Sequence, residues 1–241
     1  MFHGKMKAVT FSYDDGVTQD QRLIEILNKY GLKCTFNLNS GLLGTANALI
    51  RDGVTVAHCK PQPGEIRRIY EGHEIASHTL THPMLPAQED REVIRQVEED
   101  RLRLSELAGY EVVGFAYPGG GVNYDHRVAG LIRQSTGIRY CRTIVSSHSF
   151  DLQDNLFAFK PTVHHLMEFD EMRALAERFV ALRPETPALF YIWGHAYEFD
   201  IDNSWKKFED FCRFLSGRDD IFYGTNKEVL LAQQETPEET A

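Results

Sequence analysis

The chain has 241 residues, of which 42% are hydrophobic and 25% charged, so it can bury one large core and a single domain is expected. Acidic residues outnumber basic ones by 35 to 26, which gives a formal net charge of −9, and there is no basic block or stripe. This pattern argues against a nucleic-acid partner, and no apolar run is long enough to span a bilayer. The N-terminal residues lack the successive regions of a leader, so we expect a cytoplasmic protein without a membrane partner.

The first part of the chain alternates between predicted strands and helices. A buried strand over residues 7–12 is followed by the adjacent carboxylates Asp14 and Asp15 and then by a glycine. A helix over residues 18–30 and a strand over residues 33–38 come next. The stretch 39–64 carries four glycines and two prolines, so we expect mostly loop. A short helix over residues 65–70 then leads to a strand over 72–78.

The alternation continues to the end of the chain. Helices are expected over residues 89–107, around 128–132, and over 169–182, 204–215 and 226–232, and strands over 111–117, 139–144, 157–160, 188–193 and 221–223. We expect one domain over residues 1–233, followed by a disordered acidic tail over residues 234–241. Strands that alternate with helices predict an α/β fold with a parallel sheet, either open or closed into a barrel.

Reactive side chains follow several of the predicted strands. Asp14, Asp15, His78, Tyr117 and His195 all fall at predicted strand ends. In parallel α/β folds the functional groups collect at the carboxyl ends of the strands, so these side chains are expected at one rim.

Two histidines and a carboxylate suggest a metal site. His78 and His82 are four residues apart, a spacing that brings both rings to one face of a helical turn. Such a pair is more often two ordinary histidines, but a strand-end aspartate would complete a set of three ligands. Three protein ligands leave positions open for water and substrate, which is typical of catalytic metal sites.

Hydrolysis at such a metal also needs a base and an acid. One of the two adjacent aspartates can stay off the metal and act as the base. His195, at the end of a distant apolar strand, is the candidate acid, although a structural role is the alternative. The three glycines over residues 119–121 suit an oxyanion or simply form a tight loop.

Four separated segments, residues 10–16, 77–82, 115–120 and 192–195, resemble the motifs of the polysaccharide deacetylases, carbohydrate esterase family 4. This resemblance extends over nearly the whole chain and implies a distorted (β/α) barrel of about seven parallel strands. It also implies that Asp14 is the base and that Asp15, His78 and His82 are the metal ligands.

The last two segments complete the implied site. By resemblance, the stretch Tyr117, Pro118 and Gly119 contacts the oxyanion and the substrate, with Gly119 as the backbone donor, and His195 is the acid. Trp193 and Tyr197 are candidates to stack on a sugar ring, with core packing as the alternative for Trp193.

The chain departs from the family pattern in two places. An arginine usually pairs with the base in the third motif, and Ala116 stands at that position, so we expect Asp14 to lack this partner. The aspartate and tryptophan that support the acid histidine have no clear counterpart. Asp151, Asp154 or the pair at residues 164–165 are candidates to replace them.

These observations predict a metal-dependent hydrolase that removes an acetyl group from an N- or O-acetylated carbohydrate and does not cleave peptide bonds. The expected substrate is a small acetylated sugar or oligosaccharide, and the expected divalent ion is zinc, before nickel or cobalt. No sequence feature indicates an oligomeric state.

Two other functions fit part of the pattern. Two histidines and one carboxylate are also the ligand set of non-haem iron oxygenases, which need neither Asp14 nor His195. A non-catalytic carbohydrate-binding protein that keeps the fold is the second alternative, because the arginine is missing.

Overall fold

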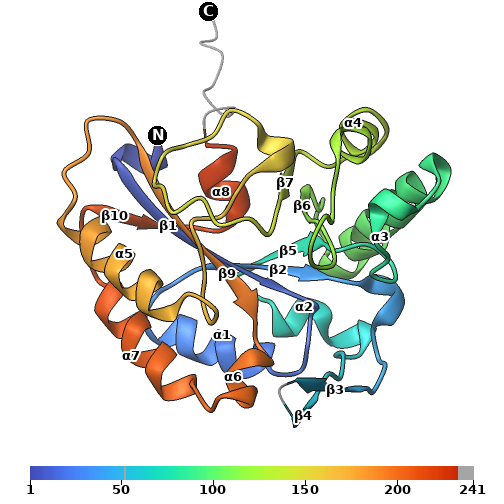
Figure 1. Ribbon diagram of the computed structural model, residues 1–241, viewed down its shortest axis with the longest axis horizontal. Helices are drawn as coiled ribbons and strands as arrows, with labels where there is room; N and C mark the ends of the chain where they lie inside the picture. The colour runs from blue at the N-terminus through green and yellow to red at the C-terminus, as the bar shows by residue number, and fades with distance from the viewer. Residues whose placement is uncertain (52, 233–241) are drawn as a thin grey trace, which may run out of the picture.

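The computed structural model describes residues 1–51 and 53–232 (Figure 1). Parallel strands form its centre: β1 (Lys7–Asp14), β2 (Cys34–Leu38), β5 (Glu74–Ser77), β6 (Gly114–Ala116), β7 (Tyr140–Arg142), β8 (Val163–His164) and β9 (Ala188–His195). Their spatial order is β7-β6-β5-β2-β1-β9-β8, and a short parallel strand β10 (Ile221–Tyr223) also pairs with β1. An isolated bridge between Arg142 and Phe159 joins β7 to the segment before β8, at the other end of this order. The expected distorted (β/α) barrel of about seven parallel strands is confirmed.

The side chains of β1 alternate between an apolar outer face and a polar interior. Phe11 and Tyr13 pack in the main hydrophobic cluster, among residues of the surrounding helices. Thr10 and Ser12 point the other way and hydrogen-bond to the buried amide of Asn226. This period-two pattern carries Asp14, the next residue on the interior side, into the open end of the barrel.

Helices cover the outside of the strands. They are α1 (Asp20–Lys29), α2 (Ile66–Ile69), α3 (Asp90–Ala108), α4 (His126–Ser135), α5 (Phe169–Ala181), α6 (Glu198–Ile201) and α7 (Trp205–Leu215). The last helix, α8 (Asn226–Leu230), instead packs against the interior side of the strands, where Asn226 contacts Thr10 and Ser12. Figure 1 shows α5 and α7 on one side of the strands and α3 and α4 on the other. α3 ends one residue beyond the expected range, and Gly109 follows it with a left-handed φ of 78°, which is accessible to glycine. None of the helices in residues 1–51 and 53–232 has the length and apolar content needed to cross a membrane.

The structure differs from the expected secondary structure in several places. The stretch predicted as loop over residues 39–64 contains an antiparallel hairpin of β3 (Ala48–Arg51) and β4 (Val54–Ala57). Residues 157–160 are not a strand, because a 3-10 helix over Leu156–Ala158 precedes the strand β8. The short helix α6 was not predicted. The domain boundary at residue 233 and the disordered tail over residues 234–241 stay predictions, since residues 233–241 lie outside the described part.

Candidate active site

A cavity of about 340 Å³ opens at the carboxyl ends of the strands. Nine of the ten side chains or glycines predicted from the sequence line it: Asp14, Asp15, His78, His82, Tyr117, Gly119, Trp193, Tyr197 and His195. Pro118 is buried beside them and is not part of the lining. Strand order explains this convergence, because β1 has β2 on one side and β9 on the other, so that Asp14 and His195 are register partners.

Three of these residues form a cluster that suits a metal ion. Asp15 Oδ1 lies 3.8 Å from His78 Nε2 and 3.6 Å from His82 Nε2. Their three donor atoms all lie within 4.8 Å of one another. Ligand atoms held tetrahedrally at about 2 Å from zinc are roughly 3.3 Å apart, so a small contraction would bring this set into coordination. The donor set therefore fits a divalent ion with open positions.

The ring of His78 is oriented by the neighbouring strand. Its Nδ1–H donates to the backbone carbonyl of Ala116 at 2.8 Å, which leaves the Nε2 lone pair facing Asp15. Burial lowers the pKa of His78 to about 4, so the ring is neutral at pH 7. A neutral imidazole whose second nitrogen is already hydrogen-bonded is the form that binds metals.

The turn that carries the two histidines is not the helical turn expected from their spacing. Thr79 and His82 have φ values of 72° and 60°, in the left-handed region, and so does Asp15 at 78°. Buried polar groups stabilise this conformation: Asp100 accepts hydrogen bonds from Ser77 Oγ and from the His78 N–H. Left-handed non-glycine residues are uncommon and cluster at functional sites.

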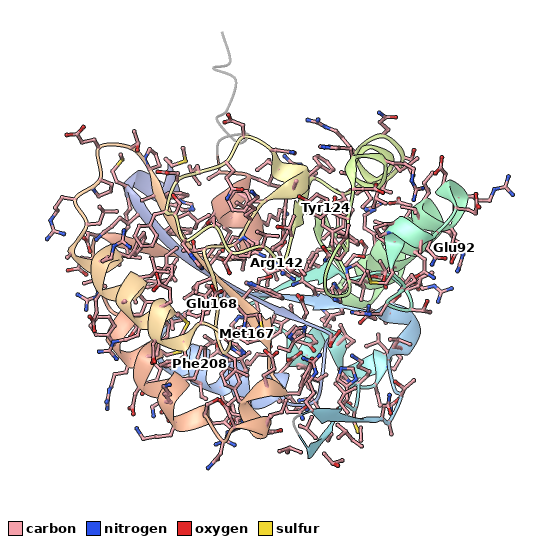
Figure 2. The ribbon with its side chains drawn as sticks, in the orientation of Figure 1. Glu92, Tyr124, Arg142, Met167, Glu168 and Phe208 are labelled. Carbon is pink, nitrogen blue, oxygen red and sulfur yellow. The ribbon has the colours of Figure 1, made fainter. Side chains whose placement is uncertain are left out.

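Asp14 has an arginine partner that the sequence did not reveal. The guanidinium of Arg142 on β7 lies 2.5 Å from both oxygens of Asp14, and both side chains are almost completely buried. Figure 2 shows Arg142 at the centre of the molecule. Asn37 donates a further hydrogen bond to Asp14 Oδ1 at 2.8 Å. Burial raises the pKa of Asp14, but Arg142, together with His78 and His195, outweighs this effect and holds the pKa below its ordinary value. The expectation that Asp14 lacks an arginine was therefore wrong.

His195 has a carboxylate partner three residues along the chain. Its Nδ1 lies 3.3 Å from Glu198 Oε1, and its backbone N–H donates to Glu198 Oε2 at 3.0 Å. Burial lowers the pKa of His195, but Glu198, with smaller contributions from Asp15 and Asp14, raises it by more, so that the pKa is about 9. His195 is therefore protonated at neutral pH, with Glu198 as its counter-charge.

The candidates from sequence for this supporting role are only partly at the site. Asp151 is exposed and hydrogen-bonds to Ser149, and Asp154 lines a different cavity. By contrast, His165 Nε2 lies 2.9 Å from Glu198 Oε2 and His164 Nε2 lies 3.4 Å from the same oxygen. Glu198 itself was missed, and its spacing of three residues from His195 was the available signal.

The sequence of this chain matches the family model described as polysaccharide deacetylase over residues 3–140. The chain belongs to the polysaccharide deacetylase family. In this family member, Arg142 lies beside Asp14 and Glu198 lies beside His195.

Solved structures share the fold of this deacetylase-family chain at low sequence identity. The Xyl-CE4 domain of a multidomain xylanase from the hindgut metagenome of Trinervitermes trinervoides is 16% identical, with a TM-score of 0.58, over 95% of this chain and 91% of that one. A family 4 acetyl xylan esterase from Clostridium thermocellum, in complex with cobalt, is 16% identical, with a TM-score of 0.57, over 96% and 93%. A Streptococcus pyogenes deacetylase in complex with acetate is 18% identical, with a TM-score of 0.50, over 62% of this chain and only 61% of that one.

The two candidate aromatic residues of the site line the cavity but are almost completely buried. Trp193 is 5% exposed, and the guanidinium of Arg142 lies 4.4 Å from its ring centroid. Tyr197 is 1% exposed and lies between the rings of His58 and His195. Contact of either ring with a sugar stays a prediction, and both rings support charged groups of the site.

The loop after β6 needs its glycine. Gly119 has a φ of 86°, and a Cβ atom there would collide with the sulfur of Met84. Tyr117 anchors the start of this loop, since its hydroxyl donates to the Phe157 carbonyl at 2.8 Å. The backbone of Gly119 therefore lies at the edge of the cavity without a side chain to cover it.

Proposed function

We propose that this protein is a metal-dependent hydrolase that removes an acetyl group from an N- or O-acetylated carbohydrate. The observation that carries the proposal is the arrangement of three groups around one cavity. Asp15, His78 and His82 form the metal-binding set, while Asp14 with Arg142 and His195 with Glu198 lie beside it.

The three ligands suit zinc, with nickel or cobalt as alternatives. A divalent ion held there supplies Lewis acidity, which polarises a carbonyl oxygen and lowers the pKa of a bound water to about 7. His78 is ready to bind it, because its Nδ1–H is already donated to Ala116.

Asp14 takes the proton of the attacking water. Its carboxylate is ionised at neutral pH, since Arg142 holds its pKa below the ordinary value. Arg142 and Asn37 also fix the orientation of the carboxylate from the side of the barrel interior. Orienting the base in this way reduces the reorganisation that proton transfer requires.

His195 gives a proton to the leaving amine or alcohol. It begins the reaction protonated, with a pKa of about 9, and Glu198 stabilises this charged form. The backbone N–H of Gly119 is assigned to the oxyanion that forms on the carbonyl oxygen, next to Tyr117 and Pro118. A base and an acid on the neighbouring strands β1 and β9 thus serve opposite ends of the reaction.

The substrate proposed is a small acetylated sugar or oligosaccharide. A cavity of about 340 Å³ accommodates a sugar ring, which matches the size of small-molecule sites.

The alternative of a non-catalytic binding protein was based on the missing arginine. Arg142 lies beside Asp14, so this reason no longer applies. An oxygenase would not need the paired charges on Asp14 and His195.

The test is acetate release from acetylated mono- and oligosaccharides by the purified protein supplied with zinc, nickel or cobalt. We expect acetate from at least one substrate, and a loss of about 100-fold or more in kcat/KM for Asp14→Asn. Asp151→Asn, a matched change at an exposed aspartate, should behave like the parent. If no substrate of the panel releases acetate and oxygen is consumed instead, the proposal is wrong.

A further inference from the structure

The β3–β4 hairpin brings two basic side chains to Asp15. His58 Nε2 lies 3.1 Å from Asp15 Oδ2, and Lys60 Nζ donates to the Asp15 carbonyl oxygen at 2.5 Å. Both are largely buried, with side-chain exposure of 14% for His58 and residue exposure of 5% for Lys60. These contacts come from a segment whose sequence predicts loop, and no motif of the site includes them.

Backbone hydrogen bonds fix the position of this segment. His58 N–H donates to the Asn47 carbonyl and Lys60 N–H to the Thr45 carbonyl, on the opposite side of the hairpin. On its other side, Thr18 N–H donates to the Cys59 carbonyl at 2.9 Å, just three residues after Asp15. The hairpin lies beside α6 at the lower edge of the barrel in Figure 1. His58 and Lys60 are therefore held against the turn that carries Asp15.

The two oxygens of Asp15 face different partners. Oδ1 faces His78 and His82, whereas Oδ2 faces His58. A carboxylate only accepts hydrogen bonds, so His58 Nε2–H is the donor in this contact. Two clusters of three donor atoms within 4.8 Å occur in the described residues: Asp15, His78 and His82 form one, and His164, His195 and Glu198 form the other. His58 belongs to neither. His58 thus contacts a ligand and is not a ligand itself.

Lys60 acts on the backbone of the same residue. Asp15 adopts a left-handed φ of 78°, which is uncommon for a residue with a side chain. The ammonium of Lys60 binds the carbonyl oxygen of this residue, so it stabilises the turn that directs the carboxylate toward the histidines. His58 thus binds the side chain of Asp15 and Lys60 binds its backbone, and both residues lie in the segment that directly follows β4.

We propose that His58 and Lys60 are positioning residues that hold Asp15 as a one-oxygen ligand and thereby raise the affinity of the site for a divalent cation. The inference rests on the metal site of the proposed function. Hydrogen bonds to ligating groups typically contribute 10- to 100-fold to metal affinity, because they hold the ligand in its bound orientation before the metal arrives. His58 supplies such a bond to the one carboxylate of the set.

The test compares two amides at position 58. In His58→Gln the side-chain N–H₂ reaches the position of Nε2, whereas in His58→Asn it is about one bond too short. Zinc and cobalt affinities of the metal-free proteins are measured by competition with a chromogenic chelator, and the visible spectrum of the cobalt form reports its coordination. We expect His58→Asn to bind both metals 10- to 100-fold more weakly, and His58→Gln to stay within about threefold of the parent.

Control variants distinguish the loss of the His58 hydrogen bond from a general loss of structure. His126→Asn, the same change at an exposed histidine at the start of α4, should leave metal affinity unchanged. Circular dichroism checks folding, and if His58→Asn is unfolded, His58→Leu replaces it, because leucine fills the space without a donor. Parent-like affinity in the folded donor-free variant, or equal weakening in His58→Gln, overturns the role of His58. Failure of the parent itself to bind either metal would instead overturn the metal site of the proposed function.

Discussion

Ala116 and Arg142 are register partners on the neighbouring strands β6 and β7, and the guanidinium of Arg142 binds Asp14. Ala116 stands where the family pattern has its arginine, so a guanidinium reaches Asp14, the proposed base, from the adjacent strand. The small side chain of Ala116 and the large one of Arg142 are complementary at this point of the barrel. Asp14 is therefore paired with an arginine, but this arginine is at position 142 and not at position 116.

Arg142→Met should therefore impair both stability and catalysis. Removing one member of a buried ion pair leaves the other uncompensated, which costs about 3–5 kcal/mol in the free energy of unfolding. The pKa of Asp14 should rise in this variant, because Arg142 lowers it in the parent. Urea denaturation measures the first effect, and the acid limb of the kcat/KM profile should move to higher pH.

The register pair offers a direct control. The double variant Ala116→Arg with Arg142→Ala should recover about tenfold of the activity lost in Arg142→Ala alone, because it returns the guanidinium to the neighbouring strand. If the two single changes simply add, the link between these positions is not through Asp14.

Glu198→Gln should shift the alkaline limb of the pH profile. Glu198 stabilises the protonated form of His195, whose pKa is about 9. Without this negative charge the pKa of His195 falls, so the acid is lost at a lower pH and kcat/KM declines earlier on the alkaline side. Asp151→Asn serves as the control and should keep the parent profile. An unchanged alkaline limb in Glu198→Gln would show that His195 is not the group that titrates there.

Removing the metal should lower both activity and thermal stability. A ligand that binds only the folded state stabilises it by about 2.7 kcal/mol at a free concentration of 100 times Kd. We expect dialysis against a chelator to abolish acetate release and lower Tm, and added zinc to restore both. His82→Ala should show no rise in Tm with zinc, because it lacks one ligand of the cluster. A Tm that is the same with and without metal in the parent would contradict the assignment.

His73 should make stability depend on pH away from the site. The Cys34 N–H donates to its Nδ1, and its Nε2–H donates to Asn28, so the folded ring is neutral. Burial lowers the pKa of His73 to about 4, whereas an unfolded histidine has a pKa of about 6.5. As pH falls between these values the unfolded state binds the proton first, and stability drops by up to about 1.4 kcal/mol per pH unit.

Urea denaturation of the parent and of His73→Gln across this pH range isolates the effect. The variant should lose less stability than the parent between pH 6.5 and 4, since it has no ring to protonate. Parallel curves for the two proteins would mean that His73 does not couple folding to the proton.

Much of the fold and most of the candidate site follow from local sequence patterns. The apolar runs that end at Asp14, His78 and His195 marked three strands and the rim where they meet. Arg142 could not be found in this way, because its relation to Asp14 depends on which strands are neighbours across the barrel. Glu198 lies in a four-residue helix, which is too short to show a helical period.

The β3–β4 hairpin and the strand β8 show a second kind of difficulty. β3 and β4 lie in a stretch rich in glycine and proline, where the local signals favour loop. β8 has only two residues, too few to show an alternating pattern, and it is recognised by its pairing with β9. The contacts of His58 and Lys60 with Asp15 depend on that hairpin, so they could not be predicted.

The left-handed residues Asp15, Thr79 and His82 have an implication for engineering this protein. Each of them strains the backbone, at a cost of about 1–3 kcal/mol, and the rest of the barrel must compensate. Thr79→Gly would relieve one of these strains and is an obvious choice for raising thermal tolerance. The same change would also make the backbone between His78 and His82 more flexible. We therefore expect Thr79→Gly to raise thermal stability and to lower catalytic activity.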